Sequence, residues 1–305
     1  MPAADEPLPL VGQESEQAQE RTQPPVLPWV LTGLLALLLA VAYRQMWPWL
    51  WLEWRTDLNS DGGYFIPALS VFLVWMKWDE LKTLPVRGSN WGLALLTVGA
   101  VLYLIGSWTG LDYSYGTSFL FVLGGLILWL LGPAYARELA FPVGFLIFML
   151  PASWGMDALT FPMRLAATKV AAFVPTLLGL PVQIIGTELK VGSYTLMIDV
   201  PCSGLRFLLA FMAGAALLGY LSECPLSRKV ALFLCAFPVA FLGNILRIDL
   251  SLFLARGISE ALAEGFFHSF SGVIVFIFGF ILLYYLRKAL CGPMPGDGPL
   301  PSDSS

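Results

Sequence analysis

Three short stretches, far apart in the sequence, carry side chains that can do covalent chemistry together. Cys202 lies in VPCSGLRF, Arg247 lies in GNILRI, and His268 lies in FFHSFSG. A thiolate can attack a carbonyl carbon, an imidazole can accept and return the proton, and a guanidinium can hold the oxyanion that forms. These residue types predict nucleophilic acyl chemistry, provided that the fold brings them to one place.

The residues around Cys202 favour a reactive thiol, although most free cysteines are buried and act as small hydrophobic side chains. Pro201, Ser203 and Gly204 indicate the start of a helix directly at the cysteine. The positive end of a helix favours the thiolate, which is the nucleophilic form. Arg206 follows one helical turn later and adds to the same field.

Arg247 and His268 each also have a simpler explanation. An arginine near the end of a membrane span often extends to the interface, and a lone histidine is usually a hydrogen-bonded structural residue. However, Asn244 shares a helix face with Arg247, Asp249 lies nearby, and polar groups in a membrane span are costly and usually functional. His268 is the only histidine and therefore the best available proton shuttle.

The composition predicts an integral membrane protein. Of the 305 residues 57% are hydrophobic and only 12% are charged, whereas charged residues make up about 25% of a soluble domain. The formal net charge is −4 and no basic tract is dense enough to suggest a nucleic-acid partner. We expect membrane lipid as the solvent and no nucleic acid.

Metal and cofactor sites are not indicated. The four cysteines show no C-x-x-C spacing, so the sequence supports neither a structural zinc site nor a disulfide framework. A single histidine excludes a metal site with several histidines. We therefore expect no metal and no other cofactor.

The hydropathy pattern predicts an all-α polytopic protein with about eight transmembrane helices, of which the second and fifth are short. The expected spans are 29–46, 64–78, 91–108, 117–132, 139–151, 204–221, 230–250 and 269–286. Residues 29–288 form one transmembrane domain in this interpretation. Residues 1–28 and 289–305 are polar and rich in proline, which predicts disordered cytoplasmic tails.

The longest segment between expected spans, about 152–202, precedes the sixth one. Its first half has helical spacing with Arg164 and Lys169 on a polar side, which predicts a helix along the membrane surface. Its second half, VQIIGTELKVGSYTLMIDV, alternates in hydropathy and contains a turn at KVGS. This pattern predicts a small hairpin that leads into Cys202.

Basic residues in short loops predict the orientation. They occupy alternate loops, which must share one side of the membrane: Lys77, Lys82, Arg87, Arg137, Arg228, Lys229, Arg287 and Lys288. This side is expected to be the cytoplasm, together with both termini. Cys202, Arg247 and His268 then lie near the outer face, at a similar depth.

The ordered motifs PCSGLR, GNILRI and FHSFSG resemble those of the exosortase/archaeosortase family, and the segment FPVGFLIFMLP also looks like the family pattern. The resemblance covers roughly residues 45–287. One departure lies in the early loop, where DGGYF has Asp61 in place of a histidine that is common in the family. This change leaves the three central residues intact.

The resemblance implies a cysteine transpeptidase or thiol protease in the bacterial inner membrane. Cys202, Arg247 and His268 would be catalytic, and Arg206, Asn244, Ser203 and Gly204 would support them. The substrates would be exported proteins with a C-terminal motif such as Pro-Glu-Pro, a transmembrane helix and a basic cluster, in a setting of protein sorting and exopolysaccharide production. The acceptor molecule stays open. The alternative is a membrane transporter or a scaffold for polysaccharide export, without enzymatic activity.

Overall fold

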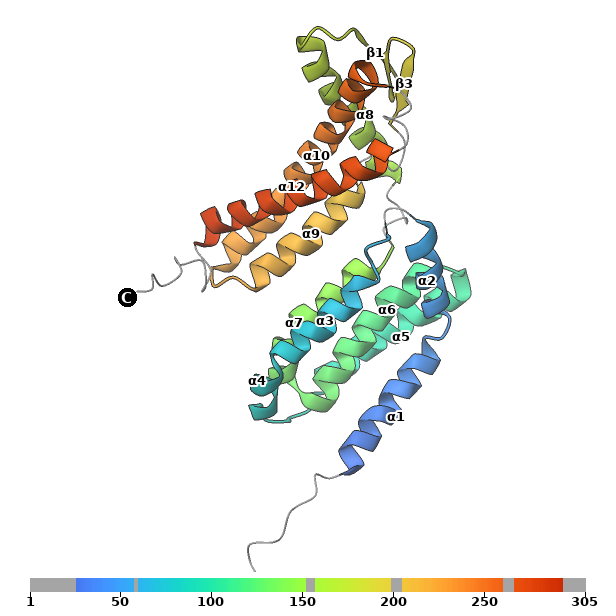
Figure 1. The fold of residues 1–305 in the computed structure, drawn as a ribbon. Helices are drawn as coiled ribbons and strands as arrows, with labels where there is room; N and C mark the ends of the chain where they lie inside the picture. Colours follow the sequence, from blue (N-terminus) through green and yellow to red (C-terminus); the bar gives the residue numbers. More distant parts are fainter. Residues whose placement is uncertain (1–25, 58–59, 152–156, 199–204, 260–265, 293–305) are drawn as a thin grey trace, which may run out of the picture. The chain divides into compact units, whose positions relative to one another are not determined.

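The apolar runs of the sequence fold into helices in the computed structural model, which describes residues 26–57, 60–151, 157–198, 205–259 and 266–292 (Figure 1). The helices are α1 (Val26–Ala42), α2 (Met46–Thr56), α3 (Phe65–Met76), α4 (Trp78–Thr83), α5 (Trp91–Thr109), α6 (Asp112–Leu126), η1 (Ile127–Leu131), α7 (Pro133–Phe145), η2 (Leu146–Met149), α8 (Asp157–Leu177), α9 (Leu205–Tyr220), α10 (Leu226–Gly257) and α12 (Phe266–Cys291). Three strands, β1 (Val182–Ile185), β2 (Glu188–Val191) and β3 (Tyr194–Met197), lie between α8 and α9.

The chain divides into two units, Met1–Gln45 and Met46–Ser305. Helix α1 belongs to the first unit, and every other helix and strand belongs to the second.

Four helical segments of the described chain are long and apolar enough to cross a membrane: Trp91–Thr109, Asp112–Leu131, Leu226–Gly257 and Phe270–Cys291. The structure therefore agrees with a polytopic, mostly helical protein but does not establish eight transmembrane helices. Helix α3, at 12 residues, is only about 18 Å long, because a helix rises about 1.5 Å per residue. The hydrocarbon core is about 30 Å thick, so this apolar run does not cross it as a straight helix.

Helices α3, α5, α6 and α7 pack together within the second unit. Small residues allow the close approach of α5 and α6, where the Ser118 hydroxyl donates a 2.7 Å hydrogen bond to the carbonyl oxygen of Gly99. The Ser70 hydroxyl of α3 donates a 2.8 Å bond to the carbonyl of Pro142 in α7. Both hydroxyls are thus satisfied inside apolar contacts, as an environment without water requires.

Helices α9, α10 and α12 form a second bundle, in which α10 contacts both of its neighbours (Figure 1). Phe211 of α9 is fully buried, and its ring lies 5.4 Å from that of Phe280 in α12. A Cβ atom added to Gly279 would collide with the Phe211 ring, and one added to Gly243 would lie 2.8 Å from the Val275 side chain. The glycines therefore permit the close packing that positions these three helices.

The three strands form an antiparallel sheet in the order β1-β2-β3, beside α8 and α10. The buried face of the sheet joins one core with these helices, formed by residues such as Leu189, Val191, Tyr194, Ala171 and Leu252. The predicted helix with Arg164 and Lys169 is present as α8, and the turn at KVGS joins β2 and β3. The sequence indicated only a hairpin, and the additional strand β1 makes it a three-stranded sheet.

Several contacts connect the helices of the bundle of α9, α10 and α12 at one end, where α9 and α12 end and α10 begins. Cys224 and Cys291 form a disulfide across 67 residues of sequence, which the cysteine spacing did not indicate. The Arg287 Nε donates a 3.1 Å bond to the Ser222 hydroxyl, and the Arg228 Nη1 donates a 3.1 Å bond to the Leu290 carbonyl. These arginines, which predict the cytoplasmic side, therefore also brace the helix ends.

A further cluster connects α3, α7 and α9. The rings of Phe141 in α7 and Tyr220 in α9 stack with centroids 4.0 Å apart, and Lys77 contacts Glu138 and lies over the Tyr220 ring. Burial alone would lower the pKa of Lys77, but the contacts with Glu138 and Tyr220 hold it above its usual value. Lys77 therefore stays charged and can contact both α7 and α9.

The first testable prediction concerns the packing of α9 against α12. Gly279→Ala should destabilise the protein by about 1–3 kcal/mol, because the new methyl group overlaps the Phe211 ring. The control in the same helix is Gly272→Ala, since nothing lies within 4 Å of a Cβ added at Gly272. Thermal unfolding in detergent checks the pair, and equal midpoints would contradict the packing described.

The second prediction links the disulfide to orientation. Disulfides do not persist in a reducing cytoplasm, and the loop charges predict that Cys224 and Cys291 lie on that side. We therefore expect both thiols to be reduced in growing cells and to form the bond when isolated membranes are oxidised. Acid quenching followed by a mass-tagged alkylating reagent measures this, in a variant with Cys202→Ala and Cys235→Ala. A disulfide already present in growing cells would argue for the opposite orientation.

Candidate functional site

Asn244 and Arg247 lie one turn apart on α10 and are both buried, with exposed fractions of 1% and 7%. Their three-residue spacing puts them on one face of the helix, as the sequence predicted. An arginine that extends to the interface would keep its charged end in water. The burial of Arg247 therefore favours a role inside the protein.

The guanidinium of Arg247 lies over the ring of Phe207, with its Cζ 5.8 Å from the ring centroid. This is a cation–π contact, which attracts a cation to the ring face and strengthens when water is excluded. Phe207 in turn stacks on Phe211, 6.2 Å away between centroids. The aromatic core between α9 and α12 thus supports the position of the guanidinium.

The described contacts give the relative heights of the three helices. Phe207 faces Arg247 and Phe211 approaches Gly243, so α10 runs antiparallel to α9. Val275 approaches Gly243, and Leu290 accepts a bond from Arg228, so α10 also runs antiparallel to α12. At about 1.5 Å per residue, Arg247 lies about 6 Å beyond Gly243, and position 268 lies about 10 Å beyond Val275 in the same direction. The backbone thus places position 268 about one helical turn from the height of Arg247.

The predicted site residues differ in how much of them the structure describes. Asn244 and Arg247 are fully described, whereas Cys202, Ser203 and Gly204 lie outside the described residues. Arg206 belongs to α9 and His268 to α12, but their side chains lie outside the described part of the chain. The structure therefore brings Asn244 and Arg247 together and leaves the contacts of the thiol and the imidazole as predictions.

Asp249, which the sequence places near Arg247, does not share its helix face. Two residues correspond to about 200° around a helix, so the two side chains point in nearly opposite directions. Asp249 is 7% exposed, and its Oδ1 has no hydrogen-bond partner among the described residues. The Ser251 hydroxyl donates a 2.9 Å bond to the carbonyl of Arg247 and holds the backbone at this point.

Sequence reasoning missed two residues of this region. Phe207, next to Arg206, reads as an ordinary apolar residue of a span, and only its contact with Arg247 shows its role. Ser271 is fully buried and lies one turn after His268 in α12. The sequence did offer a signal for Ser271, because it comes three residues after His268 and therefore lies on the same face of a helix.

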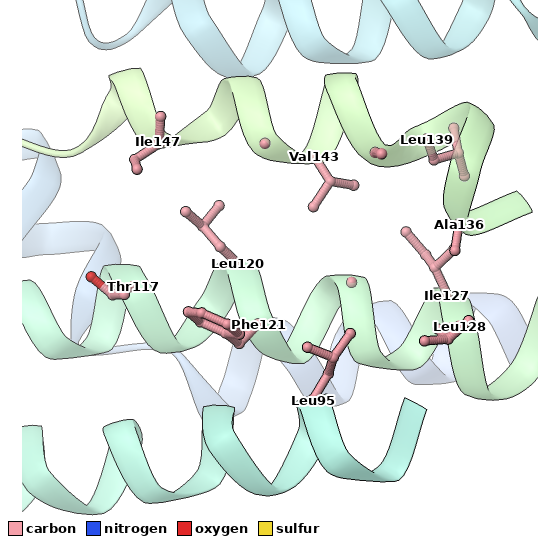
Figure 2. A pocket seen from close by; sticks show the side chains of 13 residues that line it. Leu95, Thr117, Leu120, Phe121, Ile127, Leu128, Ala136, Leu139, Val143 and Ile147 are labelled. Carbon is pink, nitrogen blue, oxygen red and sulfur yellow. The ribbon is translucent and has the colours of Figure 1, made fainter. Parts of the chain in front are cut away.

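An apolar pocket of about 390 Å³ lies between α5, α6 and α7. Figure 2 shows Leu120 and Phe121 of α6, Val143 of α7 and Ile147 of η2 around it. Apart from the Thr117 hydroxyl, the residues of this lining carry no polar side-chain atom. This pocket offers contact to hydrocarbon and no group for catalysis.

The apolar helices and the buried polar residues define the class of the protein. It is a helical membrane protein with a buried arginine inside a helix bundle. The family model of the transmembrane exosortases (Exosortase_EpsH) matches residues 54–285, which is most of the chain. No match was found among the curated proteins or the solved structures. The chain belongs to the transmembrane exosortase family.

Proposed function

We propose that this protein is a membrane-embedded cysteine transpeptidase that cleaves the C-terminal sorting signals of exported proteins at the outer face of the inner membrane. The observation that carries the proposal is the buried Arg247, which lies one turn from Asn244 on α10 and against Phe207 of α9. The first residue of α9 comes three residues after Cys202, and His268 lies in the first turn of α12. Membership of the exosortase family supports a role in sorting.

The reaction is acyl transfer in two steps. The thiolate of Cys202 attacks the carbonyl carbon of the scissile peptide bond and forms a tetrahedral oxyanion. The C–N bond then breaks, His268 gives its proton to the departing amine, and a thioester remains on the sulfur. An amine or a water molecule attacks this thioester and loses its proton to His268, and the C–S bond breaks, which restores the Cys202 thiolate and the protonated imidazole.

Arg247 fits the oxyanion step because its charge is fixed and its side chain is buried. A guanidinium is always protonated and presents a planar set of donors. Preorganised donors in a site without water stabilise developing charge far more than they would in water. Asn244, on the same face, offers an amide N–H₂ group for the same oxygen, and Arg206 adds positive charge near the start of α9.

The partners of the proposed reaction follow from its place in the membrane. The substrate is an exported protein whose C-terminus carries a short motif, one transmembrane helix and a basic cluster, and the surrounding lipid holds that helix in the plane of the bilayer. The basic loops of this chain and the basic cluster of the substrate then share the cytoplasmic side. This process is linked to surface sorting and exopolysaccharide production.

The nucleophile can be tested with a matched pair of cysteine variants. Cys202→Ala should abolish processing of a tagged substrate, because alanine cannot form the thioester. Cys235→Ala is the control, since Cys235 is a free thiol within α10. Immunoblots of processed substrate per unit of membrane-inserted enzyme measure both. Processing near the wild-type level in Cys202→Ala would contradict the proposal.

The role of Arg247 predicts that lysine cannot replace it. Arg247→Lys keeps the charge but loses the planar donors, and removal of one oxyanion donor typically lowers the rate by about 10²–10³. Arg256→Lys is the control, because Arg256 is exposed in the last turn of the same helix. Full activity of Arg247→Lys, at equal amounts of inserted protein, would assign Arg247 a purely structural role.

A further inference from the structure

Among the strands that the structure describes, β3 lies at one edge of the sheet, because the sheet order is β1-β2-β3. The Ile198 N–H donates to the Thr187 carbonyl at 2.9 Å, and Met197 and Thr195 pair with Glu188 and Lys190. Hydrogen-bonded and non-hydrogen-bonded pairs alternate in antiparallel sheets. The backbone N–H and C=O groups of Thr195 and Met197 therefore point away from β2.

The other edge of the sheet differs. Strand β1 packs against α8, and the outward N–H of Val182 donates to the Leu180 carbonyl at 2.9 Å. Among the described residues, no backbone hydrogen bond is formed by the outward groups of Thr195 or Met197. An exposed strand edge of this kind is a template for another extended chain.

We propose that the substrate segment just outside its membrane helix binds along β3 as a fourth, extended strand. This inference rests on the proposed function, since it assigns the docking site of that reaction's substrate. An extended peptide suits the edge because its own N–H and C=O groups alternate with the same period of two residues. The groups of Thr195 and Met197 would bond to the substrate backbone.

The chain itself connects this edge to the proposed nucleophile. Cys202 follows Met197 by five residues, and a residue spans at most about 3.6 Å. The cysteine therefore lies within about 18 Å of the end of β3. A substrate segment that pairs with β3 can therefore reach Cys202 with a peptide bond no more than about five residues further along.

The exposed face of the sheet gives the docked strand a charge preference. Gln183, Lys190 and Thr195 form one row across the sheet, and Lys190 is exposed. A substrate residue opposite Thr195 would lie in this row, about 10 Å from the Lys190 Cα, since neighbouring strands are about 4.8 Å apart. The long lysine side chain spans much of this distance, so an acidic side chain is favoured at that substrate position. Glu188 lies on the same face of β2, in the row of Met197, so an acidic side chain is disfavoured opposite Met197.

The first experiment removes the outward N–H of β3. Thr195→Pro should lower processing at least tenfold, mainly through a higher KM, because proline deletes a donor to the substrate and its ring obstructs pairing. Prolines are tolerated on the free side of edge strands. Ile184→Pro places the same change on an outward position of β1 and should process normally.

A small maleimide that labels Cys202 equally in wild type and Thr195→Pro would show that the nucleophile and the fold remain intact. The probe is a tagged exported protein from the same genome whose C-terminus carries one apolar span and a basic cluster. Normal processing and normal KM in Thr195→Pro would overturn the docking proposal. That result would not contradict the proposed chemistry, which is tested separately by the processing activity of Cys202→Ala.

The second experiment detects docking without catalysis. Thr195→Cys, in a variant that also carries Cys202→Ala and Cys235→Ala, is tested for disulfide formation with single cysteines scanned through the substrate segment. Pairing as a strand predicts cross-links at every second substrate position, because side chains alternate between the two faces. Cross-links at consecutive positions, or none at all, would contradict strand pairing, whatever Cys202 does.

Discussion

A guanidinium buried inside a helix bundle of a membrane protein is the constraint on which the described site depends. Burial of a charge in an apolar environment is costly unless other groups compensate it. In this chain the ring of Phe207 lies over Arg247, and Asn244 is buried one turn away. The bundle must therefore hold α9 against α10 at this height, because separation of the two helices would remove the ring from the charge.

The remaining packing follows from that requirement. Glycines at the contacts of α9, α10 and α12 let large aromatic rings fill the space between the helices, and Phe211 transmits this packing to Phe207. At the far end, Arg287 and Arg228 bond across to neighbouring segments. At the near end, α8 and the small sheet cover the last half of α10. A bundle braced at both ends can keep a reactive group at a fixed depth, which preorganised catalysis needs.

The sequence predicted the apolar helices, the turn at KVGS and the shared face of Asn244 and Arg247, because each follows from a local pattern. The number of spans was harder to predict, because a run of apolar residues does not by itself fix the length of the helix it forms, and α3 has only 12 residues and α9 only 16. The cation–π partner Phe207 and the disulfide of Cys224 with Cys291 join residues 40 and 67 positions apart. Such pairs arise from the packing of helices, which the periodicity within one segment does not reveal. The family match confirms the family, whereas the roles of Cys202, Arg247 and His268 stay predictions.

The central claim is that a thioester forms on Cys202 during processing of the substrate. The most direct measurement is mass spectrometry of substrate cleaved by the full-length enzyme in membranes, with hydroxylamine present as a strong nucleophile. A thioester intermediate predicts a product whose new C-terminus is a hydroxamate, in amounts that rise with hydroxylamine concentration. The Cys202→Ala enzyme should give no such product. Cleavage by the wild-type enzyme that yields only a free carboxylate at every hydroxylamine concentration would contradict the account.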